Sequence, residues 1–117
     1  MLEHGTDGTI YFALGSTDMR KSIDGLCAIV TQRFKLDPFT NAMFVFCGKD
    51  QRRIKILRWD NNGFWLYYKV LQTGKFRWPK DQAAVKTLNM REFRWFLDGL
   101  DLEQPKAHKA VKASILY

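Results

Sequence analysis

The sequence predicts an α+β domain, in which an antiparallel sheet of about four or five strands packs against two helices. Three observations support this prediction. Runs rich in β-branched and aromatic residues, typical of strands, occupy residues 9–14, 43–47 and 52–71. Apolar residues recur at helical spacing over residues 18–34 and again over residues 90–98. The chain of 117 residues suits one domain and leaves little room for two.

The first predicted strand, "TIYFAL" at residues 9–14, is broken by Gly15 and Ser16. The first predicted helix then runs from about Asp18, a suitable N-cap, to about Phe34. Helical spacing places its apolar stripe at Met19, Ile23, Leu26, Val30 and Phe34.

"MFVFC" at residues 43–47 is short and continuously apolar, which predicts a central strand covered on both faces. Residues 52–71 give the strongest hairpin signal, because two β-rich runs flank the turn-forming residues Asp60 to Gly63. Residues 73–79 are expected to be a loop or a short edge strand, and residues 80–87 have no clear pattern. The second helix is predicted over residues 90–98, with Asn89 as its N-cap.

The hairpin can be sorted into two faces, because side chains alternate along a strand. The face expected to lie on the core carries Arg53, Lys55, Leu57, Trp59, Phe64, Leu66, Tyr68 and Val70. The opposite face carries Arg52, Ile54, Ile56, Arg58, Trp65, Tyr67 and Lys69. There, cations that could neutralise phosphates alternate with rings that could stack on unpaired bases. The alternative is a pair of strands whose long cations lie over their aromatic neighbours.

The charge balance is basic, with 19 Lys and Arg against 12 Asp and Glu, a net charge of +7 and an isoelectric point near 9.6. Such a balance favours polyanionic partners, above all nucleic acid, although solubility alone can also explain it. Arg20 and Lys21 are notable because they occupy the first turn of the predicted helix, where the helix dipole disfavours cations. Together with free backbone N–H groups they could hold a phosphate; alternatively, they simply extend into water.

Signals of catalysis or metal binding are weak. Cys27 and Cys47 lack partners at ligand spacing and are expected to be buried free thiols. His4 and His108 lie near the chain ends, where a loose segment (1–8) and a basic, partly disordered tail (103–117) are expected around a domain over 9–102. No leader or membrane-length apolar run is found, so the default expectation is a cytoplasmic protein without cofactor or metal.

Four segments, in this order and spacing, resemble one known family. They are "TDMRKSIDGL" at 17–26, "FVFCGKDQRRIKILRWDNNGFWLYYKVL" at 44–71, "GKFRWP" at 74–79 and "FLDGLDL" at 96–102. Together they are similar to the small TnpB-type accessory protein, the product of the second open reading frame, of transposons of the insertion sequence 66 (IS66) family. The residues that carry this resemblance are Asp18, Met19, Arg20, Lys21, Arg53, Lys55, Trp59, Gly63 and Tyr68.

The resemblance implies a role in DNA transposition, with catalysis supplied by a separate transposase. The family has no established catalytic residues that could be transferred. The chain is therefore expected to bind DNA, in particular transposon ends, or to assemble with the transposase and another accessory protein. The residues expected to contact nucleic acid are Arg20, Lys21, Arg52, Arg53, Lys55, Arg58, Trp65, Tyr67 and Lys69.

Two alternatives remain open. The first is a protein-interaction module that docks on the transposase without contacting DNA, which the many Trp and Tyr residues favour. The second is a small nuclease, but a two-metal nuclease needs several converging carboxylates, and the sequence offers no convincing set of them.

Overall fold

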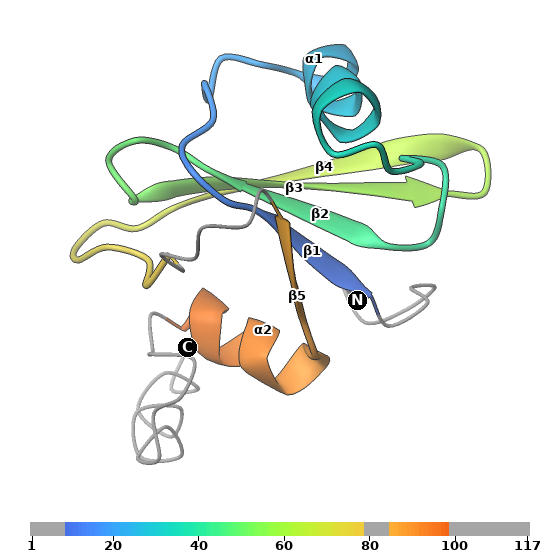
Figure 1. The fold of residues 1–117 in the computed structure, drawn as a ribbon. Helices are drawn as coiled ribbons and strands as arrows, with labels where there is room; N and C mark the ends of the chain where they lie inside the picture. The colour runs from blue at the N-terminus through green and yellow to red at the C-terminus, as the bar shows by residue number, and fades with distance from the viewer. Residues whose placement is uncertain (1–8, 79–84, 99–117) are drawn as a thin grey trace.

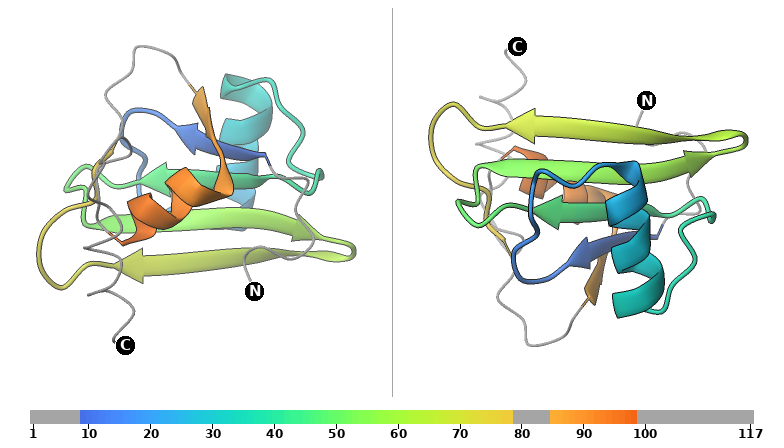
Figure 2. Two further views of the ribbon diagram at one scale, coloured as in Figure 1. Left: turned by 90° about the horizontal axis from the view of Figure 1, so that it is seen from below. Right: turned by 90° about the horizontal axis from the view of Figure 1, so that it is seen from above.

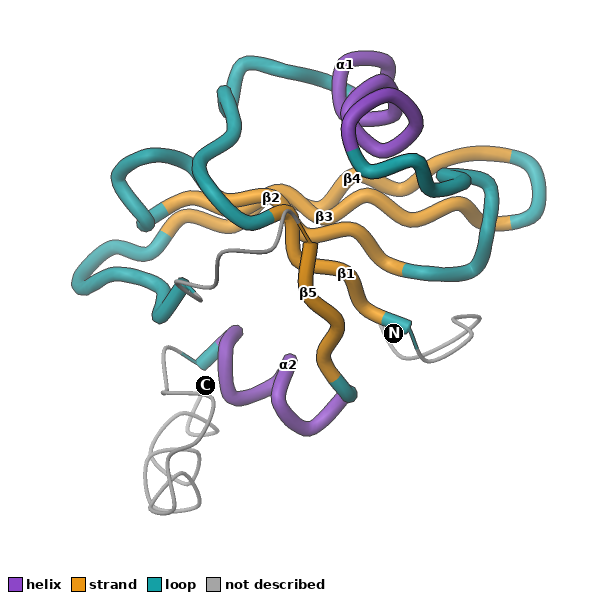
Figure 3. Tube along the Cα trace, in the orientation of Figure 1, coloured by secondary structure: helices purple, strands orange, loops and turns teal. Residues whose placement is uncertain are grey.

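A computed structural model describes residues 9–78 and 85–98. Its centre is a five-stranded sheet in the order β4-β3-β2-β1-β5, with one helix on each face (Figures 1 and 3). The strands are β1 Ile10–Ala13, β2 Met43–Cys47, β3 Arg53–Asp60, β4 Gly63–Val70 and β5 Val85–Leu88. The helices are α1 Ile23–Ala28, extended by a π-helical segment Ile29–Arg33, and α2 Met90–Leu97. The predicted α+β class is confirmed.

The sheet is mixed rather than purely antiparallel. β1 and β2 run parallel, with Ile10 opposite Met43, because the chain crosses over through α1 between them. The other strand pairs are antiparallel, as predicted. β5, which pairs with β1 at one edge, comes from the segment in which the sequence had no clear pattern.

The hairpin forms, and its side chains divide between the two faces as predicted. Asp60 pairs with Gly63, so the turn consists of Asn61 and Asn62. Asn61 has φ of 57°, a left-handed conformation that asparagine tolerates better than most residues and that two-residue hairpin turns require.

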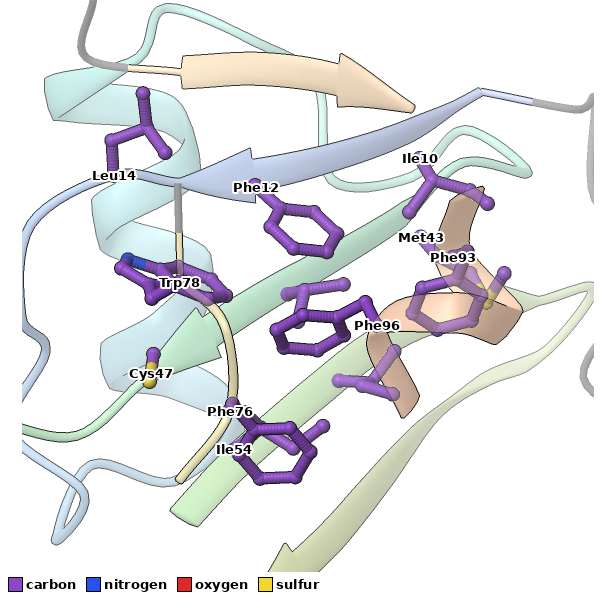
Figure 4. Packing of buried hydrophobic residues seen from close by; sticks show 12 residues of the cluster. Ile10, Phe12, Leu14, Met43, Cys47, Ile54, Phe76, Trp78, Phe93 and Phe96 are labelled. Atoms are coloured by element: carbon purple, nitrogen blue, oxygen red, sulfur yellow. The ribbon is translucent and has the colours of Figure 1, made fainter. Parts of the chain in front are cut away.

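The core on the α2 face of the sheet is built around Phe12, which is fully buried on β1. Its ring centroid lies 4.8 Å from that of Trp78 and 4.7 Å from that of Phe96. Figure 4 shows these side chains converging from β1, from the segment after β4 and from α2. The segment after β4 is a loop, as expected, but the sequence did not predict that Phe76 and Trp78 belong to the core.

The core on the α1 face is separate. Leu26 and Val30 of the helix pack over Phe44, Phe46 and Leu57 of the sheet. Every residue of β2 is buried, which confirms the prediction of a central strand covered on both faces.

The first helix begins later than predicted. Residues 18–21 form a turn instead, in which the Lys21 N–H donates to the Asp18 carbonyl at 3.1 Å. The Asp18 carboxylate accepts from the Arg20 N–H at 2.9 Å, so its acceptors serve this turn rather than a helix N-terminus. The helix starts at Ile23, with Ser22 as N-cap. Arg20 and Lys21 therefore precede the helix, and the conflict with its dipole does not arise.

The second helix is capped as predicted. The Asn89 side chain accepts from the Glu92 N–H at 2.8 Å, and the Glu92 carboxylate accepts from the Asn89 N–H at 3.1 Å. This reciprocal pair satisfies two backbone donors at the point where the chain turns from β5 into α2.

Replacing this cap provides a test of the helix boundary. Asn89→Ala is expected to lower the free energy of unfolding by about 1 kcal/mol, because the Glu92 N–H loses the side-chain oxygen that accepts from it. Denaturant unfolding measures the change. Asn89→Asp, which keeps the acceptor, should retain most of the stability, and equal losses for both variants would contradict the capping role.

Candidate nucleic-acid interface

The predicted site residues divide between the two faces of the sheet. The hairpin register sets this division, since Lys55 pairs with Tyr68 and Ile56 with Tyr67. The α1 face has Arg20, Lys21, Arg53 and Lys55, whereas the α2 face has Arg52, Arg58, Trp65, Tyr67 and Lys69. The structure thus does not bring the nine residues into one patch.

The hairpin face predicted to be open to nucleic acid is largely covered. Ile54 and Ile56 are buried in the same core as Phe93 and Phe96 of α2. Because helices cover both sides of the sheet, the expectation that only the opposite hairpin face packs on the core is wrong.

The cations of the α2 face hold other parts of the fold. Arg58 is only 5% exposed, and its guanidinium lies 3.9 Å from the Asp60 carboxylate. The Arg52 guanidinium donates to the carbonyls of residues 71 and 72 at 3.1 and 2.7 Å. The Lys69 ammonium donates to the Leu97 carbonyl at 3.0 Å, where a cation suits the C-terminal end of α2. These contacts give the three cations structural roles.

On the α1 face, cations from separate segments lie together. The Lys55 ammonium donates to the Lys21 carbonyl at 2.8 Å and so ties the segment before α1 to the sheet. The same ammonium lies 5.5 Å from the centre of the Tyr68 ring, which is 54% exposed. We call Arg20, Lys21, Arg53, Lys55 and Tyr68 the α1-face cluster.

Two glycines let the segment before α1 approach its neighbours closely. A Cβ on buried Gly48 would lie 2.9 Å from the Met19 side chain, so glycine allows the turn at residues 18–21 to lie on the end of β2. A Cβ on Gly25 would lie 3.2 Å from the Cβ of Lys21. The Thr17 N–H also donates to the Cys47 carbonyl at 2.8 Å. Backbone contacts therefore fix where Arg20 and Lys21 leave the fold.

Two carboxylates moderate the charge of the cluster. The Arg20 guanidinium forms a two-pronged ion pair with Asp18, at 3.0 and 2.8 Å. Arg53 Nε donates to Asp50 at 3.2 Å. These are exposed pairs, which water and salt screen strongly, and the Arg20 side chain stays 91% exposed. Four cations against two carboxylates leave a local excess of positive charge (4 − 2 = +2).

The pKa of the Asp18 carboxyl is held well below its ordinary value of 3.8, above all by the hydrogen bonds from the Arg20 side chain and N–H. We expect Arg20→Gln to raise it toward the ordinary value, because the guanidinium hydrogen bonds and charge are lost. Carboxyl NMR of Asp18 against pH measures this change. Since the folded pKa is the lower one, any stabilisation from the pair is present above about pH 4 and disappears as the pH falls. An unchanged midpoint in the variant would contradict the pairing.

No group of three or more His, Cys, Asp or Glu that could hold a metal ion occurs within residues 9–78 and 85–98. Cys27 and Cys47 are free thiols; Cys47 is buried, as expected, whereas Cys27 is only half-buried. Burial raises the pKa of Cys47 to about 12. Within the same residues no helix is long and apolar enough to span a membrane. His4, His108 and the expected terminal segments lie outside the described residues.

Tyr68 lies on the hairpin face that was predicted to pack on the core, but it is 54% exposed. Val70, at the same end of this face, is also 41% exposed. One feature of the sequence indicated this exposure: Tyr68 lies far from the turn, on the same face as Arg53 and Lys55.

Comparison with known proteins agrees with the resemblance inferred from the motifs. The family model described as "IS66 Orf2 like protein" matches residues 8–107, which include all five members of the α1-face cluster. This chain belongs to the IS66 Orf2-like family. The family is one of accessory proteins of IS66 elements, so the protein has an accessory role in transposition.

Two curated relatives, both from Sinorhizobium fredii, are similar to the IS66 Orf2-like protein over most of their length. "Uncharacterized protein y4hO" is 30% identical over 106 residues, covering 91% of this chain and 92% of the relative. "Uncharacterized protein y4jC" is 33% identical over 103 residues, covering 88% of this chain and 87% of the relative. No solved structure gives a significant match.

Proposed function

We propose that this IS66 Orf2-like protein is a non-catalytic transposition factor that binds DNA through the α1-face cluster. The observation that carries the proposal is that Lys55 of the hairpin binds the segment that carries Arg20 and Lys21 and also lies beside the exposed Tyr68 ring. Because the cations of the α2 face serve the fold, the proposal rests on Arg20, Lys21, Arg53 and Lys55 rather than on all nine predicted residues.

The chemistry of the cluster suits a phosphate backbone. Arg and Lys neutralise phosphates and release counterions, and this term depends little on base sequence. Arg20 can exchange Asp18 for a phosphate at small cost, since its ion pair is exposed. The Tyr68 ring, 54% exposed, offers a face on which an unpaired base could stack.

A second candidate function, docking on the transposase, is favoured by a different surface. The rings of Phe39, Trp59 and Phe64 pack together near the hairpin turn, with centroids 4.9 to 5.4 Å apart. Phe39 is 58% exposed, and aromatic residues of this kind dominate the binding energy of many protein interfaces. Both functions are compatible in one accessory protein, because the two surfaces comprise different residues.

The two functions can be separated by binding experiments with the element's own DNA ends and transposase. The purified protein is titrated into labelled end DNA and into unrelated duplex and single-stranded DNA, with and without transposase. Binding by the protein alone supports the proposed function. Association only when transposase is present, together with co-purification of the two proteins, would favour docking and overturn direct DNA binding.

A further inference from the structure

β4 is a long strand at an edge of the sheet. It spans eight residues, pairs with β3 on one side, and lies along the outer margin of the sheet (Figure 2). No other strand of the described residues pairs with its outer side. An edge of this kind presents a row of backbone N–H and C=O groups to which another strand can bind.

The hydrogen-bond pattern identifies which residues offer these groups. The Leu71 N–H donates to the Arg52 carbonyl at 2.8 Å, so the odd-numbered residues of the strand direct their backbone groups toward β3. In an antiparallel ladder the direction alternates with each residue. The groups that point outward therefore belong to Phe64, Leu66, Tyr68 and Val70.

The side chains of β4 do little to block this edge. Natural edge strands are protected by charges, prolines or bulges. β4 contains no proline, and its one charged residue is Lys69, whose ammonium is held by the Leu97 carbonyl at 3.0 Å. Trp65, Tyr68 and Val70 are instead 45%, 54% and 41% exposed, which gives the strand apolar surface on both faces.

We propose that β4 pairs antiparallel with β4 of a second copy of this chain, across a two-fold axis at Tyr67. In this register Phe64 lies opposite Val70, and Leu66 lies opposite Tyr68, so all the outward backbone groups find partners. A shift by two residues in either direction leaves one outward-facing residue of each copy without a partner inside the strand.

Charge and side-chain chemistry select a second copy as the partner. The symmetric register places Lys69 of each copy opposite Trp65 of the other, so its stem lies along an indole ring and no like charges are opposed. On the other face, Tyr68 meets Leu66 and Val70 meets Phe64, which covers apolar surface that one copy leaves exposed.

The dimer would be a continuous ten-stranded sheet (5 + 5), because each copy contributes five strands. A two-fold axis perpendicular to the sheet keeps both α1 faces on the same side. Two α1-face clusters would then face one DNA molecule; this consequence, unlike the dimer itself, rests on the proposed function.

The first test is the mass of the protein in solution as a function of concentration. Sedimentation equilibrium should approach twice the 13.7 kDa of one chain. The dimer dissociation constant of Trp65→Lys should be roughly tenfold or more above that of Trp65→Glu. In the lysine variant, residue 65 of each copy lies opposite Lys69 of the other copy, so two like charges face each other at two symmetric positions. Both variants lose the ring, so only the sign of the charge differs. A monomer at millimolar concentration, or equal dissociation constants for the two variants, would overturn the proposal.

The second test fixes the register. At the two-fold axis the Cα atoms of residue 67 should lie about 4.5 Å apart, within the range that a disulfide spans. Tyr67→Cys should therefore form a covalent dimer under mild oxidation. In the Tyr68→Cys variant the Cα atoms of the two residues 68 should lie about 8 Å apart, which is too far for a disulfide. This position should therefore not cross-link, although it is more exposed. Equal cross-linking of both variants, or none in Tyr67→Cys, would contradict pairing centred at Tyr67. DNA binding is measured separately, so a failed dimer leaves the proposed function intact.

Discussion

Phe12→Ala is expected to lower the free energy of unfolding by about 3–5 kcal/mol. Phe12 is fully buried and contacts three rings, those of Trp78, Phe93 and Phe96, with centroids 4.8, 6.4 and 4.7 Å away. Truncation removes its transfer free energy and leaves a cavity where β1, α2 and the loop after β4 meet. Urea or guanidinium unfolding followed by far-UV circular dichroism measures the change.

Phe39→Ala is the matched control for this variant. The same ring is removed, but Phe39 is 58% exposed and its ring packs against Trp59 and Phe64 near the hairpin turn. Its loss is expected to cost about 1 kcal/mol or less. If Phe12→Ala lowered the free energy of unfolding no more than this control, the result would contradict the packing of α2 and the loop against β1.

Combined Arg20→Glu and Lys21→Glu substitutions should give the largest effect on DNA binding. A charge-assisted contact contributes about 1.5–3 kcal/mol, and reversal adds repulsion from the phosphates, so affinity should fall by roughly a hundredfold or more. The fold should not change, because both side chains are exposed and the segment is held by backbone contacts. Fluorescence anisotropy with duplex DNA at fixed salt measures the affinity.

A charge-matched control separates this effect from net charge. Combined Lys75→Glu and Arg91→Glu substitutions change the net charge by the same amount at exposed positions outside the α1-face cluster. This control should lose much less affinity. If both double variants weakened binding equally, overall charge rather than the cluster would account for DNA binding.

Local patterns were sufficient to predict most of the fold. The apolar run at residues 43–47 and the turn residues at 60–63 identified β2 and the hairpin. Burial requires apolar residues and a tight turn requires particular residue types, so both can be recognised in the sequence. The capping box at Asn89 identified the start of α2 for the same reason. β5 was missed because its four residues have no periodicity of their own and are strand only by pairing with β1.

The candidate site was predicted less well, because it depends on which element covers which surface. Alternation sorted the hairpin side chains correctly, but nothing in it shows that α2 covers Ile54 and Ile56. The predicted start of the first helix was wrong for a different reason. The Asp18 side chain suits a helix N-cap and an Asx turn equally well, and contacts with Cys47 and Lys55 accompany the turn.

The central claim, that the α1-face cluster contacts DNA phosphates, is tested most directly by the salt dependence of binding. Affinity for duplex DNA is measured across a range of salt concentrations for the natural protein and for combined Arg20→Gln and Lys21→Gln substitutions. Each lost phosphate contact should lower the slope of log affinity against log salt by about 0.9, so the variant slope should be shallower by about 2. An unchanged slope in the folded variant would show that these side chains do not touch the DNA backbone.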